Sequence, residues 1–186
     1  MNFIYDIVNL QFVLIIFFLS IYYLQLDLFR SFLVLGHLIA IFLLNDVLFE
    51  PSYWSDQYAY LRTTKLIREQ VFSFFMFSPG DNLKVWLTSL GFAFFPIPFI
   101  NSIQSIAMIN FLLYLFTFIV LRKKGIHSNL IDFFFLLYPS FLLYSSLALR
   151  ETLITFLMIF AIYFYIIKKN KLYSLLFSLP LFLIKI

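Results

Sequence analysis

Long runs of apolar residues, separated by short polar or charged stretches, set the pattern of this chain. The runs cover residues 7–26, 31–49, 85–121, 133–149, 152–167 and 172–184. A helix needs about 20 mainly apolar residues to cross a bilayer, and most of these runs approach or exceed that length. We therefore predict an all-α, polytopic transmembrane helical bundle of about six spans, which forms a single domain over residues 1–186.

Two segments of this pattern are not expected to cross the membrane. Residues 85–100 contain Trp86 and a break at Pro96 and Pro98, which favours a re-entrant or interfacial helix. Residues 172–184 make a helix of about 20 Å against a hydrocarbon core of about 30 Å. We expect a C-terminal half-span there, or else a chain that is the front part of a longer protein.

The basic residues predict the orientation of the spans. Two basic clusters, at 122–124 and 168–171, flank a helical hairpin, and Arg30 lies in the first short turn. Lys and Arg are enriched in cytoplasmic turns, so these three sites belong in the cytoplasm. We then expect residues 45–84 to form an extracytoplasmic loop with an interfacial helix, in a multi-pass protein of the cytoplasmic (inner) membrane. This orientation requires that residues 85–100 do not span.

Composition excludes several classes of function. The chain is 63% hydrophobic and 12% charged, with a mean hydropathy of +0.99, whereas soluble domains carry roughly 25% charged residues. A soluble enzyme is therefore excluded. The chain has no Cys, which excludes thiol catalysis, Cys-based zinc sites and disulfides. The net charge of +4 lies mainly in turns between the runs, which indicates membrane topology and no nucleic-acid partner.

The outer loop carries acidic, aromatic and basic side chains that suit a lipid-linked sugar. The candidates are Trp54, Asp56, Tyr58, Tyr60, Arg62, Lys65 and Arg68. Aromatic rings and a carboxylate bind a sugar ring by stacking and hydrogen bonds, and basic side chains bind a phosphate. The alternative is an interfacial amphipathic helix with an aromatic belt, whose charged side chains only face water.

Arg150 and Glu151 form a second candidate site, between the apolar runs 133–149 and 152–167. Charges at this depth are costly unless they are paired or functional. Either Arg150 binds a phosphate while Glu151 fixes its rotamer, or Arg150 snorkels to the interface at a simple turn. For His37 we expect a buried, neutral side chain bonded to a neighbouring helix, and for Asp132 a helix-capping role.

Residues 138–153 resemble a region of multispanning glycosyltransferases of the GT-C type. The shared pattern is a proline, then a serine, then Leu-Arg-Glu-x-Leu, here Pro139, Ser145 and residues 149–153. The same segment is similar to the helix start, an Arg followed by an acidic residue or Gln, of O-antigen and exopolysaccharide polymerases. Both groups have an early acidic, Tyr-bearing outer loop, which residues 55–58 resemble. The resemblance extends over about residues 45–170.

This resemblance implies a membrane enzyme that transfers a sugar or oligosaccharide from a polyprenyl phosphate or diphosphate donor on the outer face. It implies Asp56 as the base that deprotonates the acceptor hydroxyl or helps to hold a divalent metal, which is optional in these enzymes. It implies Arg150 as the group that holds the leaving lipid phosphate. The implied partners are the polyprenyl-linked donor, membrane lipids and other proteins of envelope polysaccharide assembly.

Two other functions stay open. A transporter or flippase of lipid-linked oligosaccharide is favoured by the proline-broken segment at 85–104. A non-catalytic membrane subunit or truncated remnant is favoured by the short last run, because enzymes of the resembled family are usually longer and have further spans.

Overall fold

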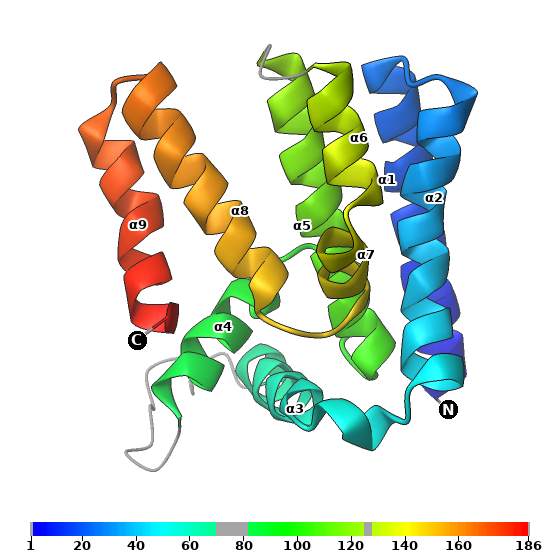
Figure 1. Cartoon of the computed structure of the whole chain (residues 1–186). Helices are drawn as coiled ribbons and strands as arrows, with labels where there is room; N and C mark the ends of the chain where they lie inside the picture. The colour runs from blue at the N-terminus through cyan, green and yellow to red at the C-terminus, as the bar shows by residue number, and fades with distance from the viewer. Residues whose placement is uncertain (1, 70–81, 125–127, 186) are drawn as a thin grey trace.

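The chain is helical throughout the residues that the structure describes. The computed structural model describes residues 2–69, 82–124 and 128–185, and no strand occurs in these ranges (Figure 1). The predicted all-α class is confirmed. Residues 70–81 of the predicted outer loop lie outside the described ranges.

Three helices are long and apolar enough to cross a membrane, which indicates a membrane protein. They are α1 (Asn2–Leu24), α2 (Leu28–Phe42, continued by the π-helical turn η1, Leu43–Leu48) and α5 (Ile103–Lys123). In α5, 78% of the apolar window is buried inside the protein, against 28% in α1 and 33% in α2. The long helix α5 is therefore the centre of the bundle, and α1 and α2 pack on one side of it (Figure 1).

The predicted span at 133–149 is not supported, because the helix breaks in its middle. Helix α6 covers Asn129–Leu137 and helix α7 covers Pro139–Ser146, with Tyr138 between them in an extended conformation. Proline has no N–H to continue the ladder of α6, and it restricts the preceding residue to extended backbone. The sequence contains this signal at Pro139, but the apolar run hides it.

Helix α8 follows α7 at a sharp angle. It covers Glu151–Ile162, continues as the π-helical turn η4 (Tyr163–Ile167), and makes an angle of 115° with α7. The described residues therefore support three spans, or four if α7 and α8 together count as one bent span, and the prediction of about six is not supported. Helix α9 (Lys171–Lys185) then returns along α8. Its assignment as a half-span stays a prediction.

The turns that carry the basic residues lie at one end of the bundle. Figure 1 shows the α1–α2 turn, the end of α5 and the α8–α9 turn together at the top of the view. The 3-10 turn η2 (Pro51–Trp54), α3 (Asp56–Glu69) and α4 (Leu83–Ala93) lie at the opposite end. The turns that the basic residues assign to one side of the membrane therefore lie at one end of the bundle, and the described part of the predicted outer loop lies at the other end.

Helices α3 and α4 form a layer across the lower end of the bundle (Figure 1). Helix α4 has 11 residues, or about 16 Å, which is too short to cross a bilayer. The guanidinium of Arg68 in α3 donates to the carbonyls of Ala93 (3.0 Å), Ile97 (2.6 Å) and Phe95, so it satisfies the open end of α4. The assignment of 85–100 as re-entrant or interfacial stays a prediction.

Candidate functional site

The turn between α7 and α8 passes through the interior of the bundle without regular helical structure. Residues Leu147, Ala148 and Leu149 are all buried. Asn110 of α5 donates its two amide hydrogens to the carbonyls of Leu147 and Leu149, each at 2.6 Å. Gln57 of α3 accepts from the N–H of Ala148 at 2.7 Å. Backbone polar groups away from water must be paired within the protein, and side-chain amides do this here.

The end of α7 is bound in the same way from α2 and η1. Asn45 donates to the carbonyl of Ser146 at 2.9 Å, and the hydroxyl of Ser146 donates to the carbonyl of His37 at 3.0 Å. The α7–α8 turn is thus held by polar side chains from η1, α3 and α5. This fixes where α8 begins, and so where Arg150 and Glu151 lie.

The turn before α8 contacts α3 through the bond between Gln57 and Ala148, which brings the two candidate sites to the same end of the bundle. Tyr60 of α3 is 3% exposed, and burial raises the pKa of its phenol to about 12. The charges of Asp56 and Glu151 raise this pKa further, while the charge of Arg150 lowers it. All three charged groups are therefore within electrostatic range of one tyrosine, although Arg150 and Asp56 are far apart in the sequence.

The two proposed catalytic residues differ in their surroundings. Asp56 is the first residue of α3 and is exposed. Arg150 precedes the first turn of α8, is partly buried, and donates from Nη1 to the carbonyl of Ile184 in α9 at 3.3 Å. A guanidinium has five N–H donors, so Arg150 retains others for an anionic ligand.

The remaining candidates of the outer loop are only partly available to a ligand. Tyr58 and Arg62 are exposed on α3, whereas the ring of Tyr60 is buried against Phe92. Trp54 packs edge-on with neighbouring aromatic rings. Stacking on a sugar from this loop would therefore use Tyr58 and not Tyr60.

The basic candidates on α3 have partners within the protein. Lys65 lies 3.7 Å from the carboxylate of Glu69, one helical turn away. Arg68 binds the three carbonyls at the end of α4 described above, and its burial lowers its pKa. Arg68 therefore has a structural role that the sequence does not reveal.

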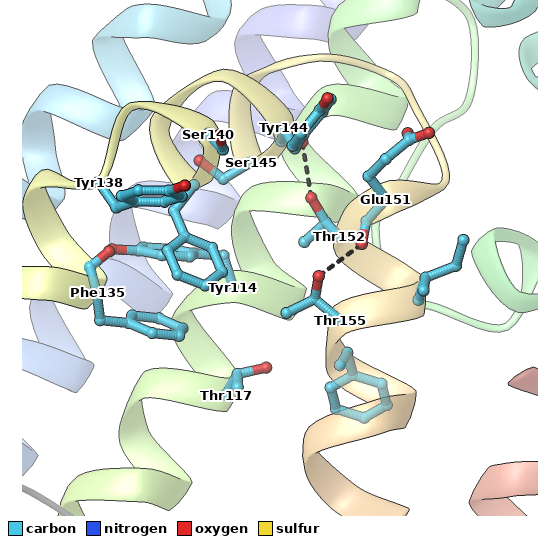
Figure 2. A pocket seen from close by; sticks show the side chains of 13 residues that line it. Tyr114, Thr117, Phe135, Tyr138, Ser140, Tyr144, Ser145, Glu151, Thr152 and Thr155 are labelled. Atoms are coloured by element: carbon cyan, nitrogen blue, oxygen red, sulfur yellow. Dashed lines mark hydrogen bonds between the residues drawn. The ribbon is translucent and has the colours of Figure 1, made fainter. Parts of the chain in front are cut away.

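A cavity for which the sequence gives no prediction opens between α5, α6, α7 and α8. Its volume is about 310 Å³. The lining includes Tyr114 and Thr117 of α5, Ser140 and Tyr144 of α7, and Glu151 and Thr155 of α8 (Figure 2). The sequence signal for this cavity is the presence of Ser and Thr residues inside apolar runs. These residues come together only because the chain breaks at Pro139.

Glu151 is the acidic side chain in the lining, and one of its carboxylate oxygens lacks a partner. Its Oε2 atom is buried and makes no hydrogen bond. A buried acceptor that is left unpaired costs about 1–3 kcal/mol, and more when it is charged. That Glu151 fixes the rotamer of Arg150 stays a prediction.

His37 forms a buried polar cluster behind the cavity. Its Nε2 lies 3.0 Å from the carbonyl of Leu136, and its Nδ1 lies 2.7 Å from the hydroxyl of Ser145. The ring of Tyr114 stacks on the imidazole at 4.3 Å. The expectation of a buried histidine bonded to a neighbouring helix is confirmed.

The capping role predicted for Asp132 is wrong. Ser128 caps α6, because its hydroxyl oxygen accepts from the N–H of Ile131 at 3.2 Å. Asp132 is buried, and its Oδ2 lies 3.3 Å from Arg30 of α2 and 3.2 Å from Arg122 of α5. The carboxylate is the centre of an ion cluster that joins three helices at the basic end of the bundle.

Among the described residues, no group of three or more His, Asp or Glu side chains could hold a metal ion. The optional divalent metal at Asp56 therefore stays a prediction.

Comparison of the chain with known protein families, with curated proteins and with solved structures finds no match in any of the three.

Proposed function

We propose that the protein is a membrane glycosyltransferase or polysaccharide polymerase that uses a polyprenyl phosphate- or diphosphate-linked sugar donor. The observation that carries the proposal is that Asp56 and Arg150 lie at the same end of the bundle, where Gln57, next to Asp56, bonds to Ala148, two residues before Arg150. A base and a phosphate-binding guanidinium at one end of an apolar bundle are the groups that such a transfer needs.

The orientation that we propose rests on the charges at the other end of the bundle. Arg30, the basic cluster at the end of α5 and the lysines of the α8–α9 turn lie together there. Basic residues in short turns favour the cytoplasmic side, so we propose that Asp56 and Arg150 lie on the outer face of the cytoplasmic membrane. A polyprenyl carrier would then reach the site from the surrounding bilayer.

The proposed reaction uses two side chains in opposite roles. The Asp56 carboxylate accepts the proton of the acceptor hydroxyl, and the acceptor oxygen forms a bond to the anomeric carbon of the donor sugar. The bond between that carbon and the phosphate oxygen breaks, and the electron pair stays on the phosphate. Arg150 stabilises this developing negative charge, as preorganised donors do where charge develops in a transition state.

A transporter or flippase of lipid-linked oligosaccharide is the second candidate. The irregular turn between α7 and α8, inside the bundle and beside a cavity, supports it, because broken helices at membrane depth occur where they line a site. Such a protein would move its substrate across a proteoliposome membrane in the absence of any acceptor, whereas a transferase would not.

The test is polymer synthesis in the source organism after deletion of the gene and complementation with variants. We expect Asp56→Asn and Arg150→Ala to abolish the product while the protein still inserts into the membrane. The matched control is Glu69→Gln, which removes an exposed carboxylate from the other end of α3 and should retain synthesis. Full synthesis by both site variants would refute the proposal.

A further inference from the structure

The cavity between α5, α6, α7 and α8 presents several hydrogen-bond acceptors to a ligand. Its carboxylate, Glu151, has an oxygen that is buried without a partner. Two other hydroxyl groups of the lining donate within the protein: Thr155 to the backbone carbonyl of Glu151 at 2.9 Å, and Thr152 to the backbone carbonyl of Tyr144 at 2.7 Å (Figure 2). Each of these hydroxyls presents its lone pairs to a ligand.

On the side of the cavity next to His37, hydroxyl groups also donate their protons within the protein. Tyr114 donates its phenol proton to the carbonyl of Phe135 at 3.0 Å. The carbonyl of Leu136 can only accept, so Nε2 of His37 carries its proton and Nδ1 accepts from Ser145 at 2.7 Å. The hydroxyls of Tyr114 and Ser145, which both line the cavity, thus use their protons inside the protein, and the Tyr114 oxygen also lies 3.3 Å from Nε2 of His37.

The lining excludes an anionic ligand and suits an uncharged, flat one. Among the described residues that line the cavity, none is Lys or Arg, and Glu151 would repel a phosphate. Six of the lining side chains are aromatic, and the C–H faces of a pyranose ring pack on such rings. A volume of about 310 Å³ is at the lower end of the range for small-molecule sites.

We propose that this cavity binds the uncharged ring of a monosaccharide, with Glu151 accepting hydrogen bonds from its hydroxyl groups. The inference rests on the proposed function and assigns it a sugar subsite. The Arg150 guanidinium donates to Ile184 of α9 and does not line the cavity, so the phosphate linked to a bound sugar would have to extend past the start of α8 to reach it. Sugar recognition then lies on α7 and α8, and the exposed aromatic residue Tyr58 of the outer loop is not required for it.

The absence of native Cys allows a direct binding test by thiol protection. Ser140→Cys introduces one thiol into the cavity wall of the full chain, purified in a detergent without a sugar headgroup. The probes are glucose, galactose and N-acetylglucosamine at tens of millimolar, with a methanethiosulfonate reagent. A sugar at about twice its Kd should slow labelling roughly threefold, because only the empty cavity reacts.

Three comparisons make the result specific. Protection should disappear in Ser140→Cys combined with Glu151→Ala and weaken with Glu151→Gln, while the rate without sugar shows that the cavity is intact. It should persist in combination with Glu69→Gln. Glu69→Cys, in an otherwise unchanged chain, should be labelled equally fast with and without sugar.

The outcomes separate this inference from the proposed function. No protection by any of the sugars, equal protection by inorganic diphosphate, or protection that survives Glu151→Ala would each overturn the sugar subsite. Loss of polymer in Asp56→Asn and Arg150→Ala without sugar protection would leave the function and refute the subsite. Sugar protection with full polymer synthesis in both variants would leave the subsite and refute the function.

Discussion

Removal of the Asn110 side chain should loosen the turn that positions the candidate site. Asn110 satisfies two buried carbonyls of the α7–α8 turn, at Leu147 and Leu149, through bonds of 2.6 Å each. In Asn110→Leu both carbonyls lose their donor, and the apolar side chain cannot replace it. Water cannot solvate them, because all three residues are buried.

The size of the effect follows from the number of bonds. Side-chain hydrogen bonds in helical membrane proteins contribute about 0.6 kcal/mol on average and up to about 1.7 kcal/mol. Loss of two bonds therefore predicts that the free energy of unfolding falls by about 1–3 kcal/mol. The measurement is reversible unfolding by SDS in mixed micelles, followed by the fluorescence of Trp54 and Trp86, the two tryptophans of the chain.

The control variant is Thr117→Val, on the same helix and equally buried. The Thr117 hydroxyl donates at 2.7 Å to the carbonyl of Leu113, within its own helix. That carbonyl keeps its backbone partner when the hydroxyl is removed, so we expect a change within about 0.5 kcal/mol. If Asn110→Leu unfolds at the same free energy as Thr117→Val, the amide does not hold the turn and our account of the site is wrong.

Four further variants test other parts of the fold with the same unfolding measurement. Asp132→Asn leaves two partly buried arginines without their shared carboxylate and should cost about 1–3 kcal/mol; a loss below about 0.5 kcal/mol would contradict the ion cluster. Gly36→Ala meets no atom within 4 Å and should stabilise α2 by about 0.5–1 kcal/mol. Gly91→Ala brings its new carbon to 3.0 Å from a leucine side chain, so a gain equal to that of Gly36→Ala would count against this packing. Arg68→Lys cannot reach three carbonyls with one ammonium group and should lower stability by about 1–2 kcal/mol; unchanged stability would contradict its role at the end of α4.

The parts of the fold that could be predicted from the sequence are those set by local pattern. Apolar length identifies α1, α2 and α5, because a spanning helix needs only a run of apolar residues. The short helix α4 and the proline break before residue 100 agree with the expectation that this segment is not a regular span. Local signals for the break at Pro139 and the cap at Ser128 were also present, but the long apolar run and the nearby Asp132 obscured them.

The site could not be predicted in full because it depends on contacts between distant segments. Asn110 is a single polar residue in an apolar helix, which indicates that it has a partner but not which one. Its partners belong to a turn that exists only because α7 and α8 diverge. The pairing of Asp132 with two arginines likewise depends on how α2, α5 and α6 pack, and no local pattern encodes that.

The most direct test of the central proposal is the side of the membrane on which residue 56 lies. Asp56→Cys introduces one exposed thiol into this Cys-free chain, and an impermeant thiol reagent is applied to intact cells. Lys123→Cys, at the basic end of α5, is the control. We predict labelling at position 56 and protection at position 123 until the cells are permeabilised. Protection at position 56 in an inserted protein would put Asp56 in the cytoplasm and contradict glycosyl transfer on the outer face.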